Sequence, residues 1–292
     1  MRQEVGATSV YMDVNPVVTC WNVRGLNNLA KRKAVREFLA SVKPNLVCLQ
    51  ETKLEIVDHF LLMQCCGPSL DGFAYLPADD TRGGILLAWD TTVLQIDSIQ
   101  RDANFLTGLV HPRVGEDWWI SVVYGPQGND AKSQLLVDLE ARRALCLGPW
   151  MVLGDFNMIL RANEKSNTNI NRTMMNKFRS FVDSCELKEL YMHGRRFTWS
   201  SERENPTLTR IERVLVSVDW ELTWPDCLLQ ALSTSVSDHA ALHITTSAAF
   251  WPKKRFRFEA FWPKLEGFEQ AVKDAWVCDP EIVDPFERLD AL

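Results

Sequence analysis

Five apolar segments of this sequence end in polar side chains of the kinds that do chemistry. These side chains are Asn22, Glu51, Tyr124, Asp155 with Asn157, and Asp238 with His239. Asp155 and Asn157 lie two positions apart, so on an extended backbone both would point to the same side. Carboxylates that bind a hard divalent cation, a histidine beside an acid and amides that hold phosphate oxygens are the groups used in metal-assisted phosphodiester hydrolysis.

Each of these residues, taken alone, also has a structural explanation. Asp155 could belong to a turn or cap a helix, and Tyr124 before Gly125 could anchor a turn. Glu51 could be a solvated strand end, and a single histidine is more often structural than catalytic. Their conjunction favours a shared site, because a carboxylate at the end of a buried strand is costly unless a charged or hydrogen-bonding group meets it.

The elements that would position these residues can be predicted from hydrophobic spacing. Apolar runs at 17–23, 43–52 and 150–155 indicate buried strands. Amphipathic spacing predicts helices near 27–42, 55–66, 130–145 and 171–185. In the last of these, the stripe consists of Met174, Phe178, Phe181 and Cys185.

The middle of the chain contains mainly short apolar segments between turn residues. The runs "GFAYLP", "GGILLAW", "VLQIDSI", "NFLTGLVH" and "WWISVVY" predict a meander of antiparallel strands. Strands outnumber helices, and the helices come early in each half of the chain. The predicted fold class is therefore α/β: a two-sheet α/β sandwich with helices on the outer faces.

Composition limits the class of protein. With 292 residues, 46% of them hydrophobic, the chain can form one large α/β domain or two small ones. The net charge of -6 argues against a surface-wide grip on nucleic acid, but it leaves room for a local basic groove. The eight cysteines lack the spacing of zinc sites or a disulfide framework. We see no signal peptide and no apolar run of about 20 residues, so we expect an intracellular protein, nuclear or cytoplasmic, without a membrane span.

Changes in residue composition along the chain predict its domain organisation. Residues 1–13 are expected to be a disordered N-terminus, and 14–246 the domain that carries the chemistry. From 247 to 292 the chain has two Trp-Pro pairs, a basic cluster at 253–257 and a helical pattern. We interpret this last part as a partly helical linker segment, truncated before another module.

Several motifs carry a family resemblance. "CWNVRGLNN", "LVCLQETKL", "VVYGP", "VLGDFNMIL" and "SDHAAL" resemble, in this order, the signatures of the endonuclease/exonuclease/phosphatase superfamily. "GRRFTWSSERENPTLTRIERVLVS" with the "FRFEAFW" tail resembles the endonuclease domain of plant LINE-type (non-LTR) retrotransposons. The resemblance implies a deoxyribonuclease-like fold, double-stranded DNA as partner and a following reverse transcriptase module, which this chain does not contain.

The resemblance also implies a role for each motif residue. Glu51, Asn22 and Asp238 would hold Mg²⁺, with Mn²⁺ as an alternative. Asp155 would deprotonate the attacking water, Asn157 and Tyr124 would hold the phosphate, and His239, oriented by Glu212, would neutralise its developing charge. The product would be a nick with a 5′-phosphate and a 3′-hydroxyl, the end that a polymerase needs as primer.

Two positions depart from the pattern of the wider superfamily. Glu212 stands where an aspartate usually orients the histidine, so its longer side chain is expected to meet His239 from a displaced angle. Arg24 stands where apurinic-site repair enzymes have an aspartate, which argues against a repair role.

The polar segment at 200–209 is expected to be a hairpin or surface loop. In the resembling family it enters the DNA minor groove, although it could also be a solvated connection. Nearby Arg203 and Arg210 are expected to contact backbone phosphates. Two alternative functions stay open at this point: a catalytically impaired retroelement remnant, and a phosphatase on the same fold.

Overall fold

The computed structural model describes residues 16–79, 82–201, 203–246, 269, 270 and 273. The predicted disordered N-terminus lies outside these residues, as does nearly all of the predicted linker with its basic cluster. The chain divides into two compact units, 1–248 and 249–292. In the described part of the second unit, Lys273 Nζ lies 2.8 Å from a carboxylate oxygen of Glu269.

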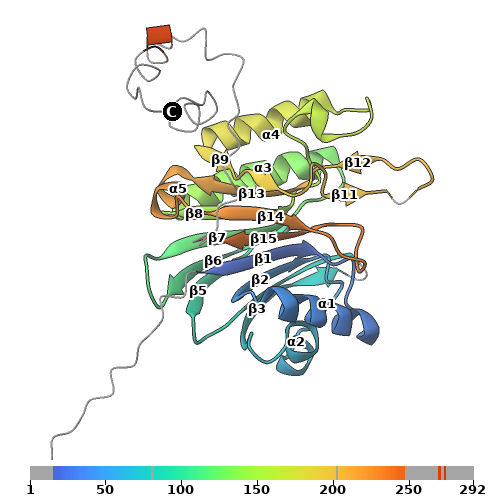
Figure 1. The fold of residues 1–292 in the computed structure, drawn as a ribbon, viewed down its shortest axis with the longest axis vertical. Coiled ribbons are helices and arrows are strands. Elements are labelled where there is room, and N and C mark those ends of the chain that lie inside the picture. The colour runs from blue at the N-terminus through green and yellow to red at the C-terminus, as the bar shows by residue number, and fades with distance from the viewer. Residues whose placement is uncertain (1–15, 80–81, 202, 247–268, 271–272, 274–292) are drawn as a thin grey trace, which may run out of the picture. The chain divides into compact units, whose positions relative to one another are not determined.

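The first unit is built on two large sheets (Figure 1). The seven-stranded sheet has the order β10 (Met192–His193), β14 (Leu228–Leu232), β15 (Ala241–Thr245), β1 (Val17–Asn22), β2 (Leu46–Gln50), β4 (Arg82–Trp89), β3 (Gly72–Asp79). The six-stranded sheet has the order β5 (Leu94–Arg101), β6 (Phe105–Pro112), β7 (Trp118–Tyr124), β8 (Trp150–Asp155), β13 (Glu212–Ser217), β9 (Leu187–Glu189). One apolar cluster joins β1, β2 and β4 to β6, β7 and β8, so the two sheets pack face to face.

Helices cover the outer faces of both sheets. The helices α1 (Leu29–Val42) and α2 (His59–Cys66) lie on the first sheet, where Val35 and Leu39 join the apolar side chains of β1 and β2. The helices α3 (Asn129–Leu145) and α4 (Arg172–Ser184) lie on the second sheet. The stripe predicted for α4 is buried there. These layers confirm the predicted α/β sandwich.

Three features differ from the expectations. The predicted meander is divided between the sheets, because the chain turns after Trp89 and β5 pairs with β6 instead of with β4. The helix α2 begins at His59, because the Asp58 side chain caps it by accepting the Leu61 N–H at 2.8 Å. The short helix α5 (Val218–Thr223) and the one-turn helix η1 (Ala162–Glu164) were not predicted.

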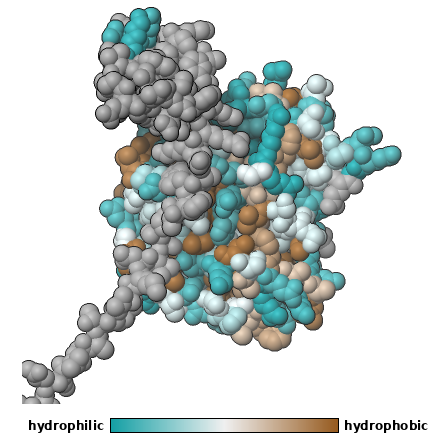
Figure 2. Space-filling view, viewed as in Figure 1, coloured by the Kyte–Doolittle hydropathy of each residue, from teal (hydrophilic) through white to brown (hydrophobic). Residues whose placement is uncertain are grey.

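The polar segment at 200–209 forms a hairpin, as expected. Its strands β11 (Trp199–Ser200) and β12 (Leu208–Thr209) pair antiparallel as a separate small sheet. The hairpin projects from the sandwich in Figure 1, and the described part of its tip is hydrophilic in Figure 2.

Two further expectations can be compared with the structure. The seven cysteines within the described residues are free thiols, and six of them are buried. Among the described helices, none is long and apolar enough to cross a membrane.

Candidate active site

The strand order brings four of the predicted residues to one end of the sandwich. The strands β1 and β2 run parallel with Asn22 opposite Gln50, so Glu51 follows at the same edge. The strands β7 and β8 also run parallel and place Tyr124 opposite Asp155. Because the carboxyl ends of parallel strands meet at one edge of a sheet, residues far apart in sequence become neighbours there.

A cavity of about 370 Å³ opens at this end. Six predicted residues line it: Asn22, Glu51, Tyr124, Asp155, Asn157 and His239. Sequence reasoning did not assign Gln127, Trp199, Thr209 and Ile211 to the site, although they also line the cavity. Gln127 directly follows the "YGP" motif. Trp199 and Thr209 belong to the β11–β12 hairpin and Ile211 to the link between β12 and β13, and no local pattern places these segments at the site.

Asp155 is held by two donors on opposite oxygens. Asn22 Nδ2 donates to Asp155 Oδ2 at 2.9 Å, and the Asn157 N–H donates to Asp155 Oδ1 at 2.9 Å. Asn157 has φ +52°, so the backbone turns after the strand. The premise that Asp155 and Asn157 lie on one extended backbone is therefore wrong. Asp155 and Asn157 nevertheless share the cavity, and Asn157 Nδ2 donates to the Gly125 carbonyl at 2.6 Å.

A glycine before Asp155 is required by the packing of these strand ends. Gly154 has φ +138°, and a Cβ at this position would lie 2.1 Å from the Val123 carbonyl oxygen. Only glycine adopts this conformation without strain. The "VLGD" motif therefore permits β8 to approach β7 closely enough to align Asp155 with Tyr124.

Glu212 contacts the histidine directly. It begins β13 opposite Asp155, is fully buried, and its Oε1 is in contact with His239 Nδ1. His239 Nδ1 also lies 4.0 Å from Asp155 Oδ2. The longer glutamate side chain therefore keeps its contact with His239 and stands close to Asp155 as well.

The close packing of Glu212, Asp155 and His239 shifts the pKa values of Asp155 and His239. Burial, followed by the Glu212 carboxylate, raises the pKa of Asp155 to about 7, although His239 and the donors from Asn22 and Asn157 oppose this. Burial tends to lower the pKa of His239, but Glu212, by its charge and hydrogen bond, and Asp155 raise it to about 9. Near neutral pH, Asp155 is thus poised to accept a proton while His239 holds one.

Glu51 also lines the cavity. Its backbone has φ +51°, and its side chain, 16% exposed, lies 3.2 Å from Lys53 Nζ. Burial and the carboxylates of Glu51 and Asp155 raise the pKa of Tyr124, so this phenol keeps its proton and can act as a donor. Strained backbone at a cavity of polar side chains is typical of functional sites.

Comparison with known families decides the class of site. A model of the Endonuclease/Exonuclease/phosphatase family matches residues 19–239. The chain belongs to this family. Family members are hydrolases that act on phosphodiester bonds and depend on metal ions, so the cavity is the candidate place of that chemistry here.

Solved structures of the family share this fold at low sequence identity. An apurinic endonuclease from Leishmania major is 18% identical with a TM-score of 0.58, covering 78% of this chain and 86% of that chain. A D. rerio TDP2 complexed with single-strand DNA product is 14% identical with a TM-score of 0.56, covering 79% and 98%. The endonuclease domain of TRAS1, a telomere-specific non-LTR retrotransposon, is 12% identical with a TM-score of 0.54, covering 79% and 97%. A comparison with curated proteins found no match.

Two groups of residues could bind the metal ion that the family uses. Asp155, Glu212 and His239 form the cluster of acids and histidine, within the described residues, whose ligand atoms all lie within 4.8 Å of one another. This cluster can hold a metal ion, but the contact between His239 and Glu212 already engages one ligand nitrogen. Hard cations prefer oxygen ligands, which Glu51 and Asn22 offer in the cavity.

Asp238 differs from its expected setting. Its Oδ2 accepts hydrogen bonds from Arg24 Nη1 at 2.6 Å and from Trp199 Nε1 at 2.9 Å, so its charge is already paired. Its Oδ1 is buried without a hydrogen-bond partner among the described residues, and it lies 3.7 Å from His239 Nε2. A cation near Oδ1 would satisfy this buried oxygen, but Asp238 is not among the residues that line the cavity with Glu51 and Asn22, so its place in the donor set stays a prediction.

The two arginines predicted to contact phosphates do not line the active-site cavity. Arg210 requires a correction: it pairs with Glu189 at 3.0 Å and its side chain is 15% exposed, so its guanidinium belongs to a buried ion-pair network. Arg203 lines a second cavity next to the active site. Arg24, in contrast, lines the active-site cavity itself, whereas the sequence indicated only the loss of an acidic group at this position.

Proposed function

We propose that this protein is a Mg²⁺-dependent DNA endonuclease that nicks one strand of double-stranded DNA. The observation that carries the proposal is the convergence of Asp155, poised near neutral pH, with a protonated His239 and the Glu51 carboxylate around one cavity. This arrangement supplies a proton acceptor, a cationic donor and a hard metal ligand in the lining of one cavity.

The reaction follows from these positions. Asp155 accepts a proton from a water molecule, and the water oxygen forms a new bond to phosphorus while the bond to the 3′ oxygen breaks. The leaving 3′ oxygen takes a proton from solvent and becomes the 3′-hydroxyl. Asn157 and Tyr124 hold the non-bridging phosphate oxygens, and His239 donates to the oxygen on which charge develops. When bound by Glu51, Asn22 and Asp238, Mg²⁺ would supply Lewis-acid stabilisation of the phosphate and of the leaving oxygen. The products carry a 5′-phosphate and a 3′-hydroxyl.

We further propose a retrotransposon origin of the LINE type. The motifs around "GRRFTW" and "RIERVL" support it, as does Arg24 in place of the repair-enzyme aspartate. The shared fold of the TRAS1 endonuclease domain is compatible with it. In this role the 3′-hydroxyl primes reverse transcription, and the hairpin made by β11 and β12 contacts the DNA groove.

Plasmid nicking tests the activity. We expect supercoiled plasmid to become open circular with Mg²⁺ and to stay supercoiled with EDTA. Asp155→Ala is expected to lower the rate by about 10²-fold to 10⁴-fold, the usual contribution of a general base. Asp183→Ala, which alters an exposed carboxylate on α4, serves as the matched control and should nick like the wild type.

The opposite results would be decisive. A folded wild-type protein that leaves plasmid intact while hydrolysing phosphomonoesters would replace the endonuclease with a phosphatase. A wild-type protein inactive on both substrates would show a catalytically impaired remnant. Nicking that survives Asp155→Ala would remove this residue from its assigned role.

A further inference from the structure

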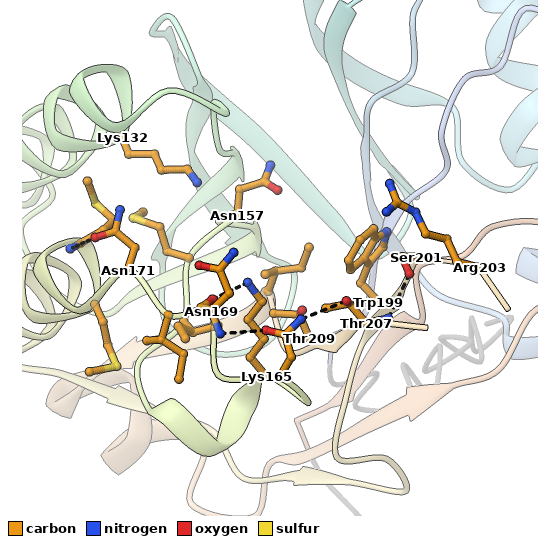
Figure 3. Close-up of a pocket in the computed structure, with 17 residues that line it drawn as sticks. Lys132, Asn157, Lys165, Asn169, Asn171, Trp199, Ser201, Arg203, Thr207 and Thr209 are labelled. Atoms are coloured by element: carbon orange, nitrogen blue, oxygen red, sulfur yellow. Dashed lines mark hydrogen bonds between the residues drawn. The ribbon is translucent and has the colours of Figure 1, made fainter. Parts of the chain in front are cut away.

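A second cavity adjoins the active site. It measures about 400 Å³ and shares Asn157, Trp199, Thr209 and Ile211 with the active-site cavity. Figure 3 shows its lining, with Lys132 entering from α3 and Lys165 from the segment before α4. The two cavities are therefore neighbours that share one wall.

Lys132 is the unusual residue of this second cavity. Its amino group has no hydrogen-bond or ion-pair partner among the described residues, whereas Lys165 Nζ donates to the Asn169 carbonyl at 2.7 Å. Burial lowers the pKa of Lys132, and the charge of Lys165 lowers it further, while Asp155 raises it. Two other cations, Lys165 and Arg203, line the same cavity, and the carboxylate of Asp155 acts on Lys132 from the neighbouring one.

The cavity combines these cations with apolar walls. Met174 and Met175 are buried and line it beside the two lysines. A half-buried ammonium group loses hydration and gains little in return unless an anion meets it, and a nearby apolar wall strengthens that attraction. The chemistry of the cavity therefore favours an anionic group that can approach Lys132 and Lys165 together.

We propose that the second cavity binds a non-scissile phosphate of the nucleic-acid strand whose neighbouring phosphate is cleaved, with Lys132 as its principal cation. The shared wall supports a strand over a free anion, because neighbouring phosphates of one backbone would reach the two adjacent cavities. This inference rests on the proposed function and deepens it: it assigns a substrate contact outside the catalytic residues.

Single neutral phosphate substitutions test this contact. A short duplex with one mapped cleavage position is prepared in versions that each carry one uncharged methylphosphonate near the cut. Affinity is measured in EDTA by fluorescence anisotropy, and kcat and KM are measured with Mg²⁺. The variants are Lys132→Gln, Lys132→Arg and, as matched control, Lys177→Gln on the exposed face of α4.

The expected pattern is specific. Wild type and Lys177→Gln should each lose about tenfold in affinity at one methylphosphonate position, the effect of one charge-assisted hydrogen bond. Lys132→Gln should lose about tenfold on the unmodified duplex and show no further loss at that same position. Lys132→Arg should restore the sensitivity, and the change should appear in KM with kcat kept within a few-fold.

Other results would overturn the inference. If Lys132→Gln binds like Lys177→Gln, or remains as sensitive as wild type to every methylphosphonate, Lys132 contacts no phosphate. If Lys132→Gln lowers only kcat, the lysine acts on Asp155 instead of on the substrate. Failure of the proposed function is distinguishable, because the wild type itself would then neither bind nor cut the unmodified duplex.

Discussion

At the residue scale, Glu212 acts on two neighbours of opposite charge. It raises the pKa of Asp155 because two buried carboxylates repel, and it raises the pKa of His239 because it attracts the imidazolium. The active combination is ionised Asp155 with protonated His239. It exists between the two pKa values, about 7 and about 9, so the nicking rate should rise through the first and fall through the second.

Glu212→Gln tests this linkage. The substitution removes the charge but preserves the size, so the pKa of Asp155 should fall and the pKa of His239 should fall too. Both limbs of the rate profile should therefore move to lower pH, and the maximum should shift in the same direction. The measurement is the nicking rate from pH 5 to pH 10 under single-turnover conditions.

The control variant for this experiment is Asp183→Asn, which neutralises an exposed carboxylate on α4. Its profile should match that of the wild type. A Glu212→Gln profile with unmoved limbs would mean that Glu212 does not set the titration of the pair. Limbs that move apart, instead of together, would contradict the assignment of Asp155 as base and His239 as acid.

The residue scale also shows what sequence reasoning can find. The search for polar side chains at the ends of apolar strands located Asn22, Glu51 and Asp155. It succeeded because parallel strands bring their ends together whatever the side-chain details. It did not place Arg24 or Lys132 in a cavity. Arg24 enters through a left-handed backbone at φ +50°, and Lys132 occupies an ordinary polar position in the first turn of an amphipathic helix. Neither feature leaves a pattern in the sequence.

At the element scale, a buried ion-pair network joins η1 and β9 to β13. Arg213 on β13 is fully buried and contacts Glu164 in η1 and Glu189 on β9. Glu164 Oε2 also accepts the N–H groups of Leu160, at 2.8 Å, and Arg161, at 3.0 Å. The network therefore fixes the segment that runs from Asn157 to η1 against the sheet.

Arg213→Met is expected to be strongly destabilising. It leaves Glu164 without its buried cation, and uncompensated buried charges cost about 3–5 kcal/mol when one partner of a pair is removed. Arg161→Met alters a member of the same network whose side chain is 59% exposed, so it should cost under about 1 kcal/mol. Urea unfolding followed by tryptophan fluorescence measures both. Equal losses in the two variants would show that burial does not govern this network.

At the scale of the whole molecule, the layer architecture was predictable and the sheet membership was not. Alternating and continuous apolar runs identified the strands, and the α4 stripe placed its helix on a sheet. The division of the meander depends on which sheet β5 joins, and that choice is made by long-range packing of Leu94 and Ile96 in the central core. Local periodicity carries no information about such contacts.

The whole-molecule organisation gives a final prediction about the region after β15. Every residue assigned to the two cavities lies between Asn22 and His239, and β15, the last strand of the described sheets, ends at Thr245. A chain ended after Ala248, at the boundary between the two compact units, is therefore expected to fold and to nick plasmid at the full-length rate.

Thermal unfolding and the plasmid assay on both chains check this expectation, with Asp155→Ala in the shortened chain as the inactive control. A cooperative transition with nicking within about twofold of the full chain would show that residues 1–248 suffice for folding and catalysis. A shortened chain that folds but binds DNA more weakly at low salt, with a shallower fall in affinity as salt is raised, would instead give the basic residues at 253–257 a share in substrate binding. Each lost phosphate contact reduces the salt dependence of the affinity.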